Sequence, residues 1–99
     1  MRNSFRTTIT RAFVRLRRQG YFCRSNFGFS VSAGWDLITW EQAEKAVFYT
    51  YQDRLYANHG SIYLAWSGDA QEICDALRDE GLMVEHDGSK DVRIKVLEV

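Results

Sequence analysis

Residues 61–81, SIYLAWSGDAQEICDALRDEG, decide the fold, because a strand pattern gives way to a helix pattern within them. Every second position of 61–66 is apolar, which is typical of a strand with one face in the core. The Ser-Gly pair at 67–68 then turns the chain. Asp69 and Glu72 follow as a D-x-x-E signature that resembles a capping box. The stretch therefore predicts a strand, a tight turn and a helix that starts after Asp69.

The predicted helix after Asp69 is amphipathic. Gly81 is well placed as the residue that follows its C-cap. Glu72, Asp75 and Asp79 fall on the outer face, so this helix is expected to be acidic toward solvent. Its expected buried stripe is Ala70, Ile73, Ala76 and Leu77.

Strand patterns lie on both sides of this unit. Downstream, 82–86 and 92–99 alternate apolar and charged residues around Asp87-Gly88-Ser89, which predicts a hairpin with Val92, Ile94 and Val96 inward. Upstream, 46–51 is a strand pattern, and 52–60 is a polar connection. The strands at 46–51 and 61–66 are expected to form a hairpin with a long loop.

The N-terminal part begins with a second amphipathic helix, predicted over residues 4–19 with Ser4 as N-cap and Gly20 at its end. The alternation of Phe27, Phe29 and Val31 with small residues predicts a strand within 21–32. A short helix is expected over 40–45, because Thr39 and Gln42 can cap it. The apolar stripe of the first helix is Phe5, Ile9, Ala12, Phe13 and Leu16.

Together these elements predict one α+β domain that covers residues 1–99. Its sheet should be mostly antiparallel, with about five strands and with helices packed on one face. The 99 residues, 45% of them hydrophobic, suffice for one core and no second domain.

Charge is separated along the chain. Residues 1–35 hold seven arginines and no acidic residue, giving +7, whereas 36–99 hold six basic and thirteen acidic residues, giving −7. On the first helix, Arg11, Arg15 and Arg18 point almost opposite to the apolar stripe, with Arg6 and Arg17 on the flank. We call Arg11, Arg15 and Arg18 the arginine ridge.

These five arginines are the residues we expect to bind a partner, because guanidinium groups suit carboxylate and phosphate. An acidic protein surface is favoured, because the −7 of the remaining chain would repel a nucleic-acid backbone. The alternatives are a nucleic-acid-binding module that uses the same arginines, and a homodimer that joins the basic helix to the acidic helix of another copy. Size and the lack of a catalytic motif also suggest an inhibitor of a bacterial defence system, such as an anti-CRISPR protein.

The sequence carries no signature of common catalysis or of phosphate, dinucleotide or zinc binding. His59 and His86 lack metal-ligand spacing, so we expect no metal, no cofactor and no catalytic residue. A small enzyme with a site near Tyr51-Gln52-Asp53 is the less favoured alternative, since this cluster is better explained as a strand end whose Asp caps the following turn.

Localisation is expected to be cytoplasmic. The sequence has no apolar run of membrane-spanning length and no apolar signal-peptide core. In such a chain, the two cysteines are expected to be reduced thiols rather than a disulfide.

Several segments together resemble an uncharacterised bacterial domain family, a domain of unknown function. Its pattern has Gly followed by an aromatic residue, then Arg, F-x-C-C-x-T-C-G, F-Y-H-x-Q-D and G-L-x-V-x-W-D-G-S. The corresponding segments here are Gly20-Tyr21 with Arg24, FGFSVSAG at 27–34, FYTYQD at 48–53 and GLMVEHDGS at 81–89.

The departures from this pattern bear on function. Phe29, Ser30 and Ala33 stand where the family has cysteines, and Thr50 stands where it has histidine. Three thiolates and an imidazole would suit tetrahedral zinc, which these replacements cannot hold. Either this lineage replaced metal or redox chemistry with packing, or the cysteines of the family were never ligands. The resemblance thus implies a fold and no activity.

Overall fold

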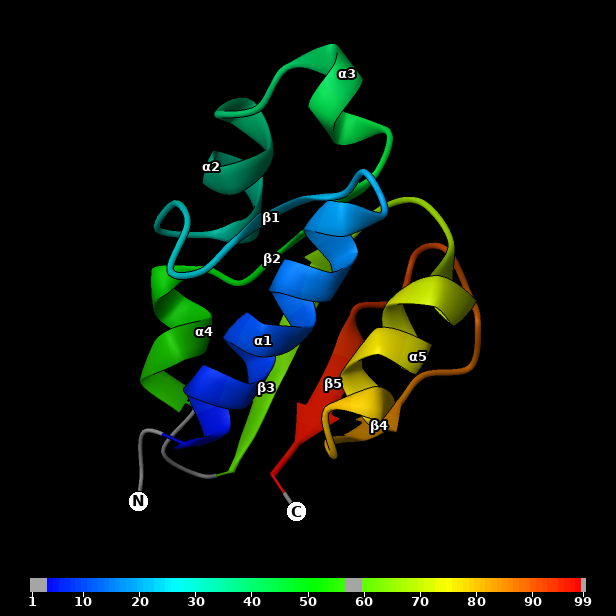
Figure 1. Cartoon of the computed structure of the whole chain (residues 1–99). Helices are drawn as coiled ribbons and strands as arrows, with labels where there is room; N and C mark the ends of the chain where they lie inside the picture. The colour runs from blue at the N-terminus through cyan, green and yellow to red at the C-terminus, as the bar shows by residue number, and fades with distance from the viewer. Residues whose placement is uncertain (1–3, 57–59, 99) are drawn as a thin grey trace.

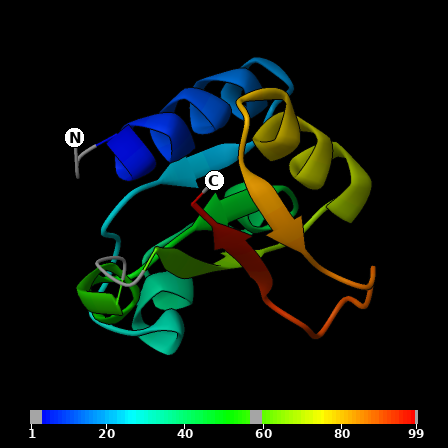
Figure 2. The same ribbon diagram turned by 90° about the horizontal axis from the view of Figure 1, so that it is seen from below.

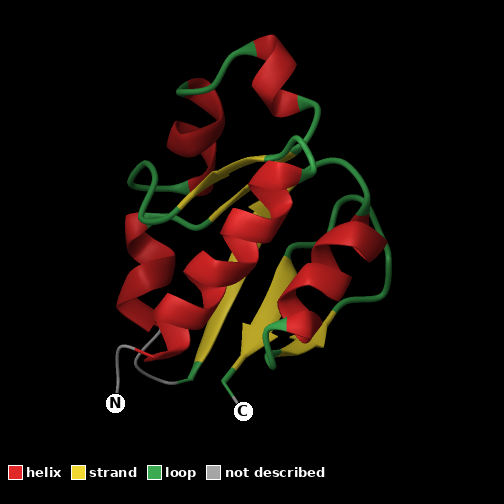
Figure 3. Cartoon of the chain, in the orientation of Figure 1, coloured by secondary structure: helices red, strands yellow, loops and turns green. Residues whose placement is uncertain are grey.

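The computed structural model describes residues 4–56 and 60–98 (Figure 1). The helices are α1 Ser4–Arg18, α2 Val31–Asp36, α3 Trp40–Ala43, α4 Tyr51–Tyr56 and α5 Ala70–Asp79, and the strands are β1 Phe22–Arg24, β2 Ala46–Phe48, β3 Ser61–Trp66, β4 Met83–Glu85 and β5 Ile94–Leu97. In the described part of the chain the strands form one five-stranded sheet in the order β1-β2-β3-β5-β4. Figure 3 shows the helices arranged around it.

The sheet confirms the predicted α+β class and its mostly antiparallel pairing. Strand β1 runs parallel to β2, and the pairs β2–β3, β3–β5 and β4–β5 are antiparallel. Strand β5 lies between β3 and β4, so the β3–α5–β4 segment is a split β–α–β unit. The stretch 61–81 therefore provides a strand and a helix of this unit, as its pattern predicts.

The helices were expected to pack on one face of the sheet, but the structure has helices on both faces. Figure 2 shows α1 and α5 on one side of the sheet and α2 and α4 on the other. The reason lies in β2, in which every residue is buried. Val47 joins the core beneath α1 and α5, whereas the Phe48 ring meets Trp35 of α2 at a centroid distance of 5.0 Å. A strand that is apolar on both faces needs cover on both.

Helix α1 matches its prediction closely. Its apolar stripe, Phe5, Ile9, Ala12, Phe13 and Leu16, is buried throughout. The helix ends at Arg18, and Gly20, two residues later, adopts φ +93°. The N–H groups of Gly20 and Tyr21 bond back to the carbonyls of Arg17 and Leu16, which is a Schellman motif. Helix α1 already includes Ser4, and the side chain of this predicted cap lies outside the described part of the structure.

Helix α5 is capped by Asp69, whose carboxylate accepts from the N–H groups of Gln71 and Glu72. The Glu72 side chain does not return to the Asp69 N–H as in a standard capping box. Instead the Tyr21 hydroxyl accepts from the Asp69 N–H at 3.0 Å and donates to Glu72 Oε1 at 2.8 Å. Tyr21 thus joins the end of α1 to the start of α5.

The strand predicted within 21–32 stops at Arg24, and this part of the prediction is wrong. The backbone turns at Asn26 and Gly28, with φ of 54° and 74°. Ser30 then caps α2 by accepting from the Ala33 N–H. The alternating aromatic pattern arises from packing in a loop and helix, since Phe27 lies 5.5 Å from Phe48 between ring centroids.

The strand predicted over 46–51 ends at Phe48, and helix α4 begins at Tyr51 and occupies the first part of the polar connection predicted over 52–60. Its start is stabilised by Thr50 and Asp53: the Asp53 N–H donates to Thr50 Oγ1, and the Thr50 N–H donates to Asp53 Oδ2. These reciprocal bonds have the pattern of a capping box, for which T-x-x-D is a readable signal. By contrast, the predicted Thr39–Gln42 capping box is present at α3.

The C-terminal hairpin forms as predicted, except at Val92. Ile94 and Val96 are buried, but Val92 is 46% exposed. Strand β5 begins only at Ile94, and before it the Val92 carbonyl accepts from the indole N–H of Trp66 at 2.8 Å. The inward alternation therefore starts two residues later than the sequence pattern suggests.

Removal of the Tyr21 hydroxyl should destabilise the fold without disturbing its core. We expect Tyr21→Phe to lower the free energy of unfolding by about 1–2 kcal/mol, because the Asp69 N–H and the Glu72 carboxylate lose their shared partner. Urea denaturation measures this. Tyr49→Phe is the matched control, because Tyr49 is also buried but its hydroxyl has no hydrogen-bond partner among the described residues. Equal losses in both variants would contradict the bridging role.

Stability should also fall at alkaline pH. Burial raises the pKa of Tyr21 to about 12 and the pKa of Cys23 to about 12. Both groups hold their protons more tightly when folded, so their contribution is complete at neutral pH and is lost as the pH rises toward 12. Urea titrations across this range should show the loss, with a shallower pH slope in Tyr21→Phe than in wild type. An unchanged slope would show that Tyr21 titrates normally.

Candidate partner-binding surface on helix α1

Packing of α1 fixes the direction of the arginine ridge. Because the opposite stripe of the helix is buried, Arg11, Arg15 and Arg18 are exposed. Val14 lies among them and is 40% exposed. These four residues, with Glu80 at the end of α5, line a hollow of about 350 Å³. The surface is thus a shallow basic depression with an apolar side chain within it.

The three ridge arginines are not equivalent. Arg15 Nε donates to Glu80 Oε2 at 2.5 Å. This bond and the carboxylate charge raise the pKa of Arg15 above its usual value, with a further contribution from Asp79. Arg11 and Arg18 have no hydrogen-bond or ion-pair partner in the described part of the chain. They are therefore the residues with donors available to a partner.

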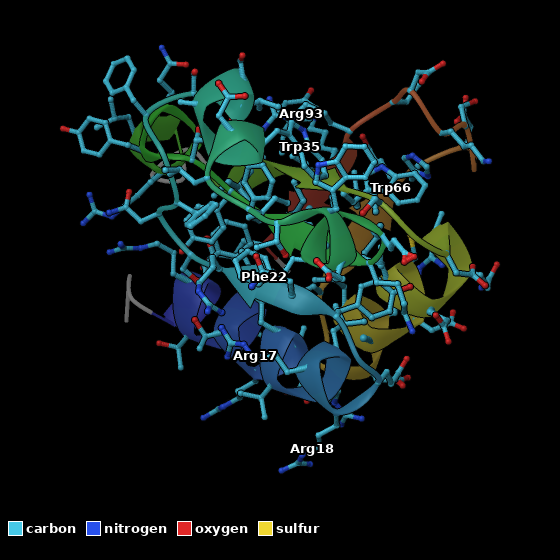
Figure 4. The ribbon with its side chains drawn as sticks, turned by 90° about the horizontal axis from the view of Figure 1, so that it is seen from above. Arg17, Arg18, Phe22, Trp35, Trp66 and Arg93 are labelled. Carbon is cyan, nitrogen blue, oxygen red and sulfur yellow. The ribbon has the colours of Figure 1, made fainter. Side chains whose placement is uncertain are left out.

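The structure separates Arg6 and Arg17 from the ridge. Arg17 donates to the Cys23 carbonyl at 2.7 Å, which ties it to β1. Figure 4 shows Arg17 lying toward Phe22 of β1, whereas Arg18 points away from the ribbon. Arg6 is half-buried and lines a different hollow, together with Tyr49. Three of the five predicted arginines therefore lie together, and Arg6 and Arg17 each lie elsewhere.

The acidic and basic helices lie side by side in one molecule (Figure 1). Helix α5 exposes Glu72, Asp75 and Asp79, and Glu80 bonds to Arg15 at the border between the helices. The charge separation along the sequence thus becomes a separation across one face of the protein. This face is positive over α1 and negative over α5.

The Tyr51-Gln52-Asp53 cluster has a structural role in the fold. Besides capping α4, Asp53 Oδ2 pairs with Arg93 Nη2 at 2.6 Å. Arg93 also donates to the Tyr63 carbonyl at 2.8 Å, so α4, β3 and the start of β5 are joined. Sequence reasoning identified Asp53 as a turn cap but missed Arg93, because no local pattern links positions 40 residues apart.

Three of the positions at which the resemblance implies cysteine or histidine serve the fold here. Phe29 stacks on Tyr51 with ring centroids 5.8 Å apart. Ser30 caps α2, and Thr50 caps α4. Backbone N–H groups at the start of α4 bond to the carbonyls of Gly28 and Phe29, so these positions lie close together. Among the described residues, no group of three His, Cys, Asp or Glu could hold a metal ion.

The remaining reactive side chains are engaged or buried. Cys23 and Cys74 are free and buried, and burial raises the pKa of each thiol. Both are therefore weak nucleophiles at neutral pH. His86 Nε2 lies 2.8 Å from the Val92 carbonyl, and its Nδ1 accepts from the Gly88 N–H. His59 lies outside the described residues. None of the helices described is both long and apolar enough to cross a membrane.

Neutralising Asp53 should reduce stability, because its carboxylate accepts bonds from Thr50 and Arg93. We expect Asp53→Asn to lower the free energy of unfolding by about 2 kcal/mol in urea denaturation. Asp91→Asn is the control, since Asp91 is exposed nearby and should change stability by less than about 0.5 kcal/mol. If Asp53→Asn folded as stably as wild type, the structural role assigned to Asp53 would be wrong.

The comparisons with known proteins agree with the resemblance in the sequence. No curated protein and no solved structure matches the chain. One family matches over residues 7–99, which is nearly the whole chain, and its description is "Domain of unknown function (DUF6891)". The chain belongs to this family of unknown function.

Proposed function

We propose that this chain is a small binding or regulatory protein without enzymatic activity, which docks on an acidic protein surface through the arginine ridge. The observation that carries the proposal is the state of Arg11 and Arg18: both are exposed and have no partner among the described residues. Ordinary surface arginines are solvated, but these two flank an exposed Val14 at the edge of a hollow. Arginines around a small apolar centre are typical of energetically important parts of interfaces.

A protein partner is favoured over a nucleic acid for two reasons. Val14 offers apolar contact area, and a charged phosphate backbone does not pack against an apolar side chain. Asp79 and Glu80 border the ridge, and Glu80 already neutralises Arg15. A phosphate backbone that followed α1 would approach these carboxylates at close range, and the chain as a whole carries no net charge to offset them. A protein can place its acidic residues locally over Arg11 and Arg18 and avoid α5.

A second copy of the chain is one protein that could meet this requirement. Its acidic helix exposes Glu72, Asp75 and Asp79, and a two-fold arrangement would place each basic helix against the acidic helix of the other copy. The more specific hypothesis, that the partner belongs to a bacterial defence system, rests only on chain size and on the lack of a catalytic motif. Identification of the molecule that binds to the arginine ridge tests both the hypothesis of a second copy and the hypothesis of a defence-system partner.

The test compares wild type with an Arg11→Glu/Arg18→Glu variant in affinity capture from lysate of the source organism, with and without nuclease, at low and high salt. We expect a nuclease-resistant protein to be retained by wild type at low salt only, since exposed charges are screened by salt. The variant should bind this protein at least about tenfold more weakly. Sedimentation of the purified protein shows whether the retained partner is a second copy.

The matched control is Arg24→Glu/Arg54→Glu, which makes the same change in charge outside the ridge. Circular dichroism must show that both variants fold. A further variant, Val14→Ser, should weaken the binding of a protein partner and leave the binding of a nucleic acid unchanged. Equal retention by wild type and the ridge variant would refute the proposal, and loss of the bound material on nuclease treatment would assign the ridge to nucleic acid instead.

A further inference from the structure

A second hollow lies on the opposite face of the sheet from the arginine ridge. It measures about 180 Å³ and is walled by Trp35 of α2, by Trp66 at the end of β3 and by residues that precede β5. Figure 4 shows Trp35, Trp66 and Arg93 gathered on the side of the sheet away from Arg17 and Arg18. The complete lining is Val31, Trp35, Ala65, Trp66, Lys90, Asp91, Val92 and Arg93.

Arg93 lines this hollow and also carries an unused donor, although that donor is not itself exposed in the hollow. Its Nη2 is occupied by Asp53 and by the Tyr63 carbonyl. Its Nε is buried and has no hydrogen-bond partner within the described residues. A buried N–H without a partner destabilises the fold, so such an atom in a native structure needs an explanation. An acceptor that enters the hollow beside Arg93 would supply one.

The other polar groups of the lining define the kind of acceptor. The Trp66 indole N–H is already bonded to the Val92 carbonyl. The Lys90 ammonium and the Trp35 indole N–H have no partner in the described part of the chain, so the unused groups are mostly donors. Asp91 on the lining and Asp53 behind Arg93 oppose a second negative charge. These groups favour a singly charged acceptor over a phosphate dianion.

Size and wall chemistry limit the ligand further. A hollow of 180 Å³ corresponds to about six water molecules at liquid density, which is too small for a nucleotide. Two indole rings and the Val31 and Ala65 side chains give it apolar walls. A carboxylate on a short carbon chain fits both the volume and the walls.

We propose that this hollow, the Trp35–Trp66 slot, binds a carboxylate on a short carbon chain, with the Arg93 Nε–H as the donor that recognises it. The carboxylate can belong to a free small acid or to an acidic side chain of a polypeptide. The site does not involve the arginine ridge, so it stands independently of the proposed docking function.

The test is a titration followed by ¹H–¹⁵N correlation spectra, in which the Arg93 Nε–H and each indole N–H give separate signals. Propionate is the probe and propionamide its uncharged control. We expect saturable shifts of the Arg93 and Trp35 signals with propionate, with a dissociation constant on the order of millimolar, and none with propionamide. The signal of Trp40, which is 92% exposed on α3, should stay in place as an internal control.

Arg93→Lys is the decisive variant, because lysine can keep the ion pair with Asp53 but has no Nε–H. We expect it to fold and to bind propionate at least about tenfold more weakly, judged by the Trp35 signal. Lys90→Gln provides a second variant at an exposed position, with a smaller expected loss. Glutamate and glutamine, each blocked at both backbone ends, then identify the source of the carboxylate. If blocked glutamate binds and blocked glutamine does not, the ligand is an acidic side chain of a polypeptide. If blocked glutamate does not bind, the ligand is a free small acid.

Three results would overturn the proposal: no saturable shift with propionate, equal binding of propionamide, or unchanged affinity in folded Arg93→Lys. Any of them would mean that the Arg93 Nε–H does not recognise a carboxylate in this hollow. If Arg93→Lys failed to fold, the wild-type comparison of propionate with propionamide would still decide the question. Inorganic phosphate is the remaining control, and binding as tight as that of propionate would refute the assignment to a carboxylate.

Discussion

Burial of β2 on both of its faces is the constraint on which the rest of the structure depends. One face carries Val47 and the neighbouring Tyr49, whose ring lies 6.3 Å from that of Phe13 in α1. The other face carries Phe48, against which α2 packs, and a Cβ on Gly34 of α2 would overlap the Phe48 ring. Since α1 bears the arginine ridge and α2 bears a wall of the Trp35–Trp66 slot, the interior strand β2 sets the position of both candidate sites. The two sites lie back to back across the sheet.

The net charge of zero arises from opposite charges that lie on one face of the protein, positive over α1 and negative over α5. Repulsion among the exposed arginines of α1 is relieved by the carboxylates of the adjacent α5, most directly at the Arg15–Glu80 pair. An arrangement of this kind can orient an approaching partner, because the sign of the potential changes across a single surface. It would contribute little to affinity by itself, since exposed ion pairs stabilise weakly. Specific contact depends on the unpaired Arg11 and Arg18 and on the apolar Val14 within the depression.

Elements marked by local signals could be predicted from the sequence. The stripe of α1, the Asp69 cap and the terminal glycines of both helices could be predicted, because each of these features acts over one or two turns. The α5 stripe was predicted in part, since Cys74 is buried and Ala70 is only partly buried. The aromatic residues of 27–31 gave a wrong strand prediction. Their alternation with small residues indicates a strand only when the backbone stays extended, and here the backbone turns at Gly28. The T-x-x-D signal of α4 begins at Thr50, but Thr50 also falls within the strand pattern of 46–51, so the signal was not recognised as a helix start. The helical periodicity located the ridge arginines. The Trp35–Trp66 slot could not be foreseen, because it joins residues from three separate parts of the chain.

The parallel pairing of β1 with β2 has a consequence for how the protein acquires its structure. Strands β3, β4 and β5 follow one another over residues 61–97 and pair across α5 or a short loop. Strand β1, by contrast, can reach β2 only after the crossover through α2 and α3 has closed, and that closure costs chain entropy before any contact is gained. The C-terminal half is therefore suited to form early as a cooperative unit, with the β1–β2 edge added late. Amide hydrogens of β1 would then exchange with solvent through partial opening at lower free energy than those of β3 and β5.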